Sequence, residues 1–286
     1  MKCNKLKLKM ADGVEVETIE DLRDHFDLIA LLERYSSGEL PEWLSVGYPN
    51  EAEKVRSLDR STDDFEEKLC SIFQITFSLD EAVSSAREAA EQGNAEGQFR
   101  LGCYYMHGIG VEENKSLAVE WIRKAAEQGH VAAQYELGID YMDGYGVAVD
   151  EPEGVRWIRA AAENGNIDAQ VNMGVFYSGG IGVKVDAELD EFEEAIRWFK
   201  MAADAGSIEA KYWLGGTYWG KDDERSFYYF KTATENGYPV AKYYLALFYL
   251  NGKVVEKDEE KAIRMLREAA ECSDVEASEV LENMGL

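Results

Sequence analysis

The fold is decided by one stretch of sequence, Ala133-Gln-Tyr-Glu-Leu137-Gly138-Ile-Asp-Tyr141-Met-Asp-Gly144-Tyr-Gly146-Val147. Ala133, Leu137 and Tyr141 recur every four residues, so they share one face of an expected helix. Gly138 has no side chain to hold a neighbouring helix away. Gly144 favours the end of the helix, because glycine adopts the left-handed cap conformation at no steric cost.

The residues that follow predict a second helix, which makes the unit a helix hairpin. Trp157 and Ala161 place a large and a small side chain on one face of this helix. The glycines that close the second helix in successive units lie 36, 36, 41 and 31 residues apart, at Gly93, Gly129, Gly165, Gly206 and Gly237. Self-similarity at this period indicates a solenoid, in which each unit buries its apolar face by stacking on its neighbours.

The repeat positions divide the chain into two parts. A solenoid is predicted over 61–286, with terminal half-repeats and with full repeats at about 95–130, 131–166, 167–207, 208–238 and 239–274. The irregular spacings arise between the two helices of a hairpin, where the third repeat is longer by five residues and the fourth is shorter by a similar number. Loops on the surface tolerate such changes.

The repeats resemble the Sel-one-like repeat family, a relative of the tetratricopeptide solenoids. The first copy carries the resemblance in Phe99-Arg-Leu101-Gly102-Cys-Tyr-Tyr105-Met-His-Gly108-Ile-Gly110-Val111 and Ala118-Val-Glu-Trp121-Ile-Arg-Lys124-Ala125-Ala126-Glu127-Gln-Gly129. It departs from the family pattern at Gly97 and Asn114, where alanine and aspartate are usual. The resemblance implies an all-α fold, a right-handed superhelical α-solenoid of helix hairpins, and a role in protein-protein interaction.

Residues 1–60 predict a small α+β module ahead of the solenoid. Leu8 and Val16 belong to alternating stretches on either side of a turn signal at Asp12-Gly13, which indicates a β-hairpin. Helices are expected from Thr18, near Pro41 and from Asn50. The string LLERYSSGELPEWLSVGYPNEAEKVRSLD resembles a short helical module found ahead of varied domains in bacterial proteins. Two roles remain open for this module, a cap on the apolar end of the solenoid or a separate recognition element.

The composition is strongly acidic, with a net charge of −26 from 56 acidic and 30 basic residues. Nucleic acids and anionic membranes are poor partners for such a chain, because binding them depends on Lys and Arg that neutralise phosphate. The charge has two possible meanings, a solvated surface that aids solubility or attraction for a basic partner.

The cysteines and the hydropathy pattern predict a cytoplasmic protein. The four cysteines are scattered and form no CxxC pair, at Cys3, Cys70, Cys103 and Cys272. The N-terminus lacks the apolar core of a signal peptide, and no stretch is long enough to span a bilayer.

Sequence motifs for catalysis or cofactor binding are weak. Gly215-Gly-Thr-Tyr-Trp-Gly220-Lys221-Asp222 approaches a P-loop, but Asp222 stands where a P-loop has Ser or Thr and would repel phosphate. The three histidines belong to different parts of the chain, at His25, His107 and His130. Neither GxSxG nor SxxK occurs. We therefore expect no catalytic residues, no metal and no cofactor. Trp121, Trp157 and Trp198 share one repeat position, which predicts that they are core residues.

The function predicted from the sequence is a non-enzymatic scaffold or adaptor that binds a protein or peptide. Two other classes remain open, a hydrolase-type enzyme built on the same repeat fold and a structural spacer. A cluster of titratable groups in a closed pocket would favour the enzyme, whereas an open groove would favour the adaptor.

A partner-binding face is expected on the first helix of each repeat, opposite the core stripe and on the concave side of the solenoid. In the first three repeats it is polar and mostly acidic, with Glu96, Arg100, Glu136, Asp143, Asp168 and Asn172. In the last two it is largely aromatic, with Glu209, Tyr212, Trp213, Trp219, Tyr243, Tyr244 and Leu247. The expected ligand has basic residues at one end and apolar residues at the other. The alternative is that the rings are buried against adjacent helices.

Overall fold

The computed structural model describes residues 8–9, 15–16, 31, 35, 40–41, 44, 48–58, 68–69, 72–73, 79–181, 190–271 and 275–285. The chain divides into two compact units, Met1–Gln128 and Gly129–Leu286. The division falls after the first full repeat, and each unit is considered by itself. Both are built from stacked helix hairpins, which confirms the predicted all-α solenoid.

The first unit contains a strand pair and the start of the repeat array. Strands β1 (Leu8–Lys9) and β2 (Glu15–Val16) pair antiparallel, with Leu8 opposite Val16. The helices of this unit are α4 (Pro49–Arg56), α6 (Leu79–Glu91), α7 (Ala95–His107) and α8 (Lys115–Glu127). The predicted turn at Asp12-Gly13 and the predicted helix from Thr18 lie outside the described residues, so the α+β module and its boundary at 60 remain predictions.

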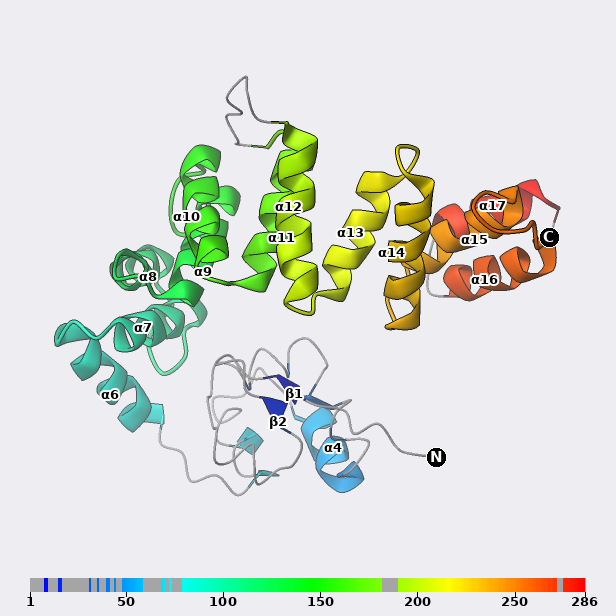
Figure 1. Cartoon of the computed structure of the whole chain (residues 1–286). Helices are drawn as coiled ribbons and strands as arrows, with labels where there is room; N and C mark the ends of the chain where they lie inside the picture. The colour runs from blue at the N-terminus through cyan, green and yellow to red at the C-terminus, as the bar shows by residue number, and fades with distance from the viewer. Residues whose placement is uncertain are drawn as a thin grey trace. The chain divides into compact units, whose positions relative to one another are not determined.

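The second unit is a succession of hairpins (Figure 1). Its helices are α9 (Val131–Asp143), α10 (Glu151–Glu163), α11 (Ile167–Gly179), α12 (Glu191–Asp204), α13 (Ile208–Tyr218), α14 (Asp223–Glu235), α15 (Ala241–Asn251), α16 (Glu259–Glu271) and α17 (Val275–Asn283). Each second helix also packs on the first helix of the next hairpin. The last, α17, is the predicted terminal half-repeat, with Leu281 buried and Glu282 exposed.

Local sequence sets the helix ends. A polar residue caps the start of most first helices by accepting a backbone N–H three residues on, at Asn94, His130, Asn166 and Ser207. The second helices begin in the same way at Asn114, Asp150 and Asp222, whereas Asp190 accepts from the backbone N–H two residues on. Asn114 therefore does the work of the aspartate that is usual in the family. Because these caps recur in register, each hairpin starts and stops at equivalent residues.

The contact between the two helices of a hairpin is centred on one glycine. A Cβ atom on Gly138 of α9 would lie 2.5 Å from Cγ1 of Ile158 and 3.0 Å from the Gly154 carbonyl oxygen on α10. The same close approach recurs in three other repeats, between Gly102 and Ile122, between Gly174 and Phe199, and between Gly215 and Phe230. The helices are therefore too close for any side chain at this position, as the sequence predicted.

A second recurring contact ties successive hairpins together through a buried glutamine. Gln98 donates to the Ala90 carbonyl oxygen (3.3 Å), and its own Oε1 accepts from Gln128 at the end of α8 (2.6 Å). In the next repeat, Asn164 Nδ2 donates to Gln134 Oε1 (3.0 Å).

The third repeat breaks this network. Gln170 still donates to the Ala162 carbonyl oxygen (3.1 Å), but its buried Oε1 has no hydrogen-bond partner within the described residues. The helix-end position that holds Gln128 and Asn164 in the earlier repeats holds Ala205 in this one, and alanine has no side-chain donor. The Gln170 oxygen therefore lacks a donor because Ala205 stands where the earlier repeats have an amide side chain.

The three tryptophans of the second helices differ in burial. Trp198 is 1% exposed and belongs to the core, as predicted. Trp121 and Trp157 are half-buried, with Lys124 over one ring at 3.7 Å and Arg156 over the other at 4.8 Å. The core prediction is therefore wrong for Trp157, whereas Trp121 packs against the core cluster of the first unit with part of its ring accessible.

The substitution Gly138→Ala should lower the free energy of unfolding by about 1–3 kcal/mol, because the added methyl group overlaps Ile158 and forces α9 and α10 apart. Gly216→Ala provides a matched control. Gly216 lies in α13 with open space around it, so alanine there should be neutral or stabilise by up to about 1 kcal/mol. Urea unfolding measures both, and equal effects would contradict the close approach at Gly138.

The substitution Ala205→Asn should raise the free energy of unfolding by about 1 kcal/mol, because its side-chain amide supplies the donor that Gln170 Oε1 lacks. The gain should vanish when Ala205→Asn is combined with Gln170→Leu, and a double-mutant cycle in urea measures this coupling. A gain of the same size in both backgrounds would mean that the new amide acts elsewhere.

Candidate functional site

The acidic part of the predicted face is exposed. In the first unit, Glu96 and Arg100 on α7 form an ion pair one turn apart, so each charge is largely offset by the other. In the second unit, Glu136 and Asp143 are exposed on α9, and Asn172 on α11 is half-buried. Whether these residues bind a partner stays a prediction.

A hydrogen bond joins neighbouring first helices on this face. Asn172 Nδ2 on α11 donates to the hydroxyl oxygen of Tyr135 on α9 (3.2 Å). Burial, followed by the charge of Asp168, raises the pKa of Tyr135 to about 12, and Glu136 and Glu209 add to this effect. Carboxylates from α9, α11 and α13 therefore surround one phenol, and the potential on this face is negative.

The aromatic part of the predicted face forms one ring cluster across α13, α14 and α15. Its centre is Phe230 of α14, which is fully buried and stacks on Tyr244 with ring centroids 4.6 Å apart. Tyr212 and Trp219 each contact the Phe230 ring at 5.9 Å. Tyr243 contacts Tyr244 at 5.0 Å. The structure thus brings the predicted rings together.

The rings are both accessible at the surface and packed against adjacent helices, which were the two alternatives left open by the sequence. Tyr212, Trp213, Tyr243, Tyr244 and Leu247 are half-buried, so each has one side packed and another accessible. Tyr244 in particular covers Phe230, and its removal would open the core. The predicted rings are therefore also packing residues.

Trp219 is 39% exposed and lies at the shortened loop of the fourth repeat. Its ring meets Phe248 of α15 at 4.9 Å and Tyr244 at 5.5 Å. Beside it, Lys253 Nζ lies 2.7 Å from Asp223 Oδ2. Trp219 therefore helps to hold the shortened loop against the next hairpin.

Sequence reasoning missed Tyr238. Its ring lies 5.1 Å from that of Tyr212, and burial followed by the charge of Glu209 raises its pKa. Tyr238 occupies the repeat position at which the earlier first helices have their polar cap, and α15 begins without a side-chain cap. The tyrosine in place of a polar cap residue is the sequence feature that could have indicated its part in the ring cluster.

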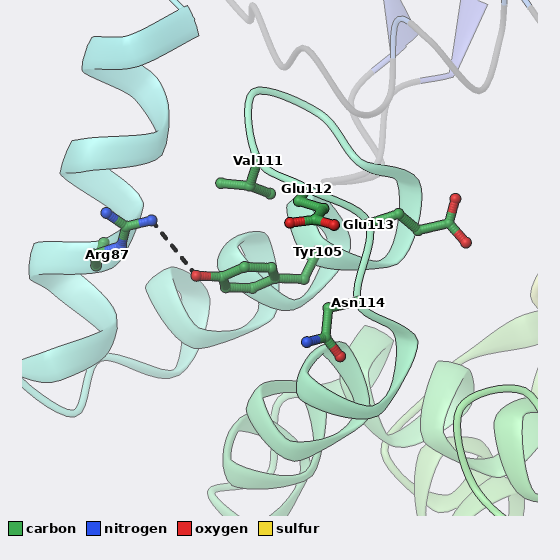
Figure 2. Close-up of a pocket in the computed structure, with 6 residues that line it drawn as sticks. All are labelled: Arg87, Tyr105, Val111, Glu112, Glu113 and Asn114. Carbon is green, nitrogen blue, oxygen red and sulfur yellow. Dashed lines mark hydrogen bonds between the residues drawn. The ribbon is translucent and has the colours of Figure 1, made fainter.

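A hollow in the first unit lies between α6 and the loop after α7 (Figure 2). It has a volume of about 430 Å³ and is lined by Arg87, Tyr105, Val111, Glu112, Glu113 and Asn114. Arg87 donates to the Tyr105 hydroxyl (3.5 Å), and Arg159 donates to Tyr177 (3.1 Å) at the same 18-residue separation in the second unit. This pairing recurs with the repeat, which is typical of a packing contact.

Residues that could carry chemistry have structural partners. His130 caps α9 through Nδ1, and Asp222 caps α14. Lys221, the lysine of the P-loop-like string, lies 3.4 Å from the ring centre of Phe192. His25 lies outside the described residues. Within the described ranges, no three His, Cys, Asp or Glu side chains are grouped so that they could hold a metal ion.

Asp140 on α9 is a buried carboxyl group outside the predicted face. It is 4% exposed, and its Oδ2 has no hydrogen-bond partner among the residues that the structure describes. Burial raises the pKa of Asp140 to about 7, and the charges of Glu136 and Asp143 add to the shift. The equivalent positions of the other repeats hold Tyr104, Phe176, Thr217 and Phe248, so the acid stands where three of these four repeats have an aromatic ring.

The sequence matches the family model for the Sel1 repeat five times in succession, over residues 95–130, 131–166, 167–207, 208–238 and 239–274. The chain belongs to the Sel1 repeat family. Solenoids of this family commonly act as protein-interaction scaffolds, and the family is generally non-catalytic. A comparison with curated proteins found no match.

Two solved structures are similar to the chain. A Sel1 repeat protein from Oxalobacter formigenes is 30% identical with a TM-score of 0.59, over 68% of this chain and 82% of that one. A protective antigen of uropathogenic Escherichia coli with an SLR fold is 28% identical with a TM-score of 0.64. That match covers 91% of this chain but 50% of the antigen, so the chain spans about half of its length.

None of the helices in the described part of the chain is long and apolar enough to cross a membrane.

The burial of Asp140 predicts that stability falls as the pH rises. The carboxyl group ionises near pH 4 in the unfolded chain and near pH 7 in the folded one, so stability is full below about pH 4 and is lost between pH 4 and 7. Asp140→Asn removes this loss and should stabilise the protein at pH 8 by roughly 2–4 kcal/mol, with little gain at pH 4. Melting temperatures across this range measure the difference. The exposed control Glu163→Gln should show no such trend, and a pH-independent gain for Asp140→Asn would contradict the shifted pKa.

Proposed function

We propose that the protein is a non-enzymatic scaffold or adaptor that binds a protein or peptide on the first-helix face of its repeats. The observation that carries this proposal is a ring cluster with one accessible side, bordered by carboxylates on neighbouring first helices. Anchored aromatic side chains are frequent hot spots of protein interfaces.

The residues of this docking surface in the second unit are Glu136, Asp143, Asp168, Asn172, Glu209, Tyr212, Trp213, Trp219, Tyr238, Tyr243, Tyr244 and Leu247. Glu96 and Arg100 present a comparable polar surface in the first unit. The excess of carboxylates favours a partner segment with basic residues, and the rings favour apolar residues next to them.

The same charges argue against nucleic acid as a partner. The scattered cysteines, which form no CxxC pair, favour the reducing environment of the cytoplasm.

Reversal of two exposed charges tests the proposal without truncating any ring. Asp168 and Glu209 are exposed and take part in no ion pair within the described residues. The double variant Asp168→Lys with Glu209→Lys should therefore lose captured partners from native lysate by at least about tenfold, while the helical circular dichroism and melting temperature stay close to wild type.

The matched control is Glu163→Lys with Glu193→Lys, which makes the same change in net charge on second helices. Mass spectrometry of the captured proteins, with all variants at equal concentration, measures the effect. Identical capture by wild type and by the first double variant would overturn the proposal, and equal losses in both variants would reduce it to an effect of net charge.

A further inference from the structure

We infer that Glu209 and Trp213 form a subsite for an arginine side chain of the partner. This inference rests on the proposed docking surface and names one residue that it recognises. It follows from a comparison of two Glu/Trp pairs within this chain, one of which already holds an arginine, and a third helix repeats the contact of that arginine with its glutamate.

The filled pair lies on α10. Trp157 Nε1 donates to Glu153 Oε1 (2.9 Å), four residues earlier on the helix. Arg156 lies over the Trp157 ring at 4.8 Å, and its guanidinium donates to both oxygens of Glu153, with Nε 2.9 Å from Oε2. A planar guanidinium suits this arrangement because it can stack on a ring and bind a carboxylate through two donors.

A related arrangement lies on α12 with the same spacing, although the buried Nε1 of Trp198 has no hydrogen-bond partner within the described residues and only the arginine binds the glutamate there. Arg197 Nη1 donates to both oxygens of Glu194, at 3.3 and 3.2 Å, and its guanidinium lies 5.4 Å from the Trp198 ring. Both helices therefore carry the pattern Glu-x-x-Arg-Trp, in which the arginine precedes the tryptophan.

The second pair lies on α13 and lacks its arginine. Trp213 Nε1 donates to Glu209 Oε1 (3.1 Å), as Trp157 does to Glu153. The residue before the tryptophan is Tyr212, which carries no positive charge and packs into the ring cluster. Glu209 is exposed and has no ion pair within the described residues, and Lys211 on the same helix does not lie within ion-pair distance of it.

The pair on α13 is also held in place. The Trp213 ring stacks on Phe199 with centroids 6.0 Å apart and planes 4° apart, and the edge of Tyr212 lies against it at 5.5 Å. The indole hydrogen bond in turn orients the Glu209 carboxylate. Little freedom is lost on binding when ring and carboxylate are fixed beforehand, which favours affinity.

The surroundings favour a cation with an apolar neighbour. Asp168 on α11 is exposed and unpaired within the described residues, and its charge and that of Glu209 both raise the pKa of Tyr135. Glu209 also raises the pKa of Tyr238, so its negative charge extends towards the rings. An arginine bound at Glu209 would thus lie between the carboxylates of α9 and α11 and the tyrosines near α15.

The test uses a defined peptide and the full chain. The probe is acetyl-Gly-Arg-Leu-Gly-amide, compared with the same peptide carrying citrulline, which is nearly isosteric and neutral, or lysine. The readout is the indole N–H resonance of Trp213 in proton–nitrogen correlation spectra, assigned with Trp213→Phe. The arginine peptide should shift this resonance saturably, with affinity at least about tenfold above that of the citrulline peptide and above that of the lysine peptide.

Two variants at conserved volume complete the test. Glu209→Gln keeps a hydrogen-bond acceptor for the indole and should lose the arginine preference, whereas Glu193→Gln, an exposed acid on α12, should retain it. Equal affinities for arginine and citrulline peptides, no saturable shift, or a preference that survives Glu209→Gln would overturn the inference. If the charge-reversed variant still loses its partners in that case, the docking surface stands and only the arginine subsite is wrong.

Discussion

The structure depends on one close contact, the approach of each first helix to its own second helix at a glycine. Where Gly138 meets Ile158 the backbones are so near that a methyl group has no room. This contact fixes the geometry of the hairpin, and the hairpin in turn fixes which residues of the first helix point into the core and which remain outside. In the fifth repeat Ala246 takes the place of the glycine, and it belongs to the same buried cluster as Leu266 of α16.

The repeats share this contact but differ in how they are joined. The first three use a buried glutamine and polar helix caps, which satisfy backbone groups between hairpins. The last two replace that glutamine with Lys211 and Lys242, and Lys242 forms an ion pair with Glu268 (3.0 Å). Their hairpins are joined mainly by rings around Phe230. The array therefore passes from polar to aromatic joints, and the ring-rich docking surface is a consequence of the second kind of joint.

The proposed partner-binding surface is built from several repeats. Carboxylates on α9, α11 and α13 reach one region because successive first helices lie next to one another, as the bond from Asn172 to Tyr135 and the contact of Tyr212 with Tyr244 show. The solenoid thus assembles a surface from residues about one repeat apart in sequence. Within one chain, the Glu153/Trp157 pair with its bound Arg156 provides a comparison for the exposed Glu209/Trp213 pair.

The sequence by itself determined the architecture of the repeats. The spacing of the glycines, the polar caps and the apolar stripe each depend on neighbours within one helix or one hairpin. Sequence periodicity alone therefore predicts these features. The same repeats also identify the family and the acidic residues of the first helices. Even the departure at Gly97 has a local cause, since a Cβ there would lie 2.5 Å from Cβ of Ala89 in the preceding helix.

Only the tertiary structure decided how far each residue on that face is buried and what it touches. Equivalent positions read alike in sequence, yet Trp198 is core whereas Trp157 lies under Arg156, and Tyr244 is a cover for Phe230 as well as a surface ring. The reason is that burial and ring stacking depend on side chains of the next hairpin, about one repeat away along the chain. Asp140, Gln170 and Tyr238 show the same limit, because their consequences appear only when the hairpins are packed together.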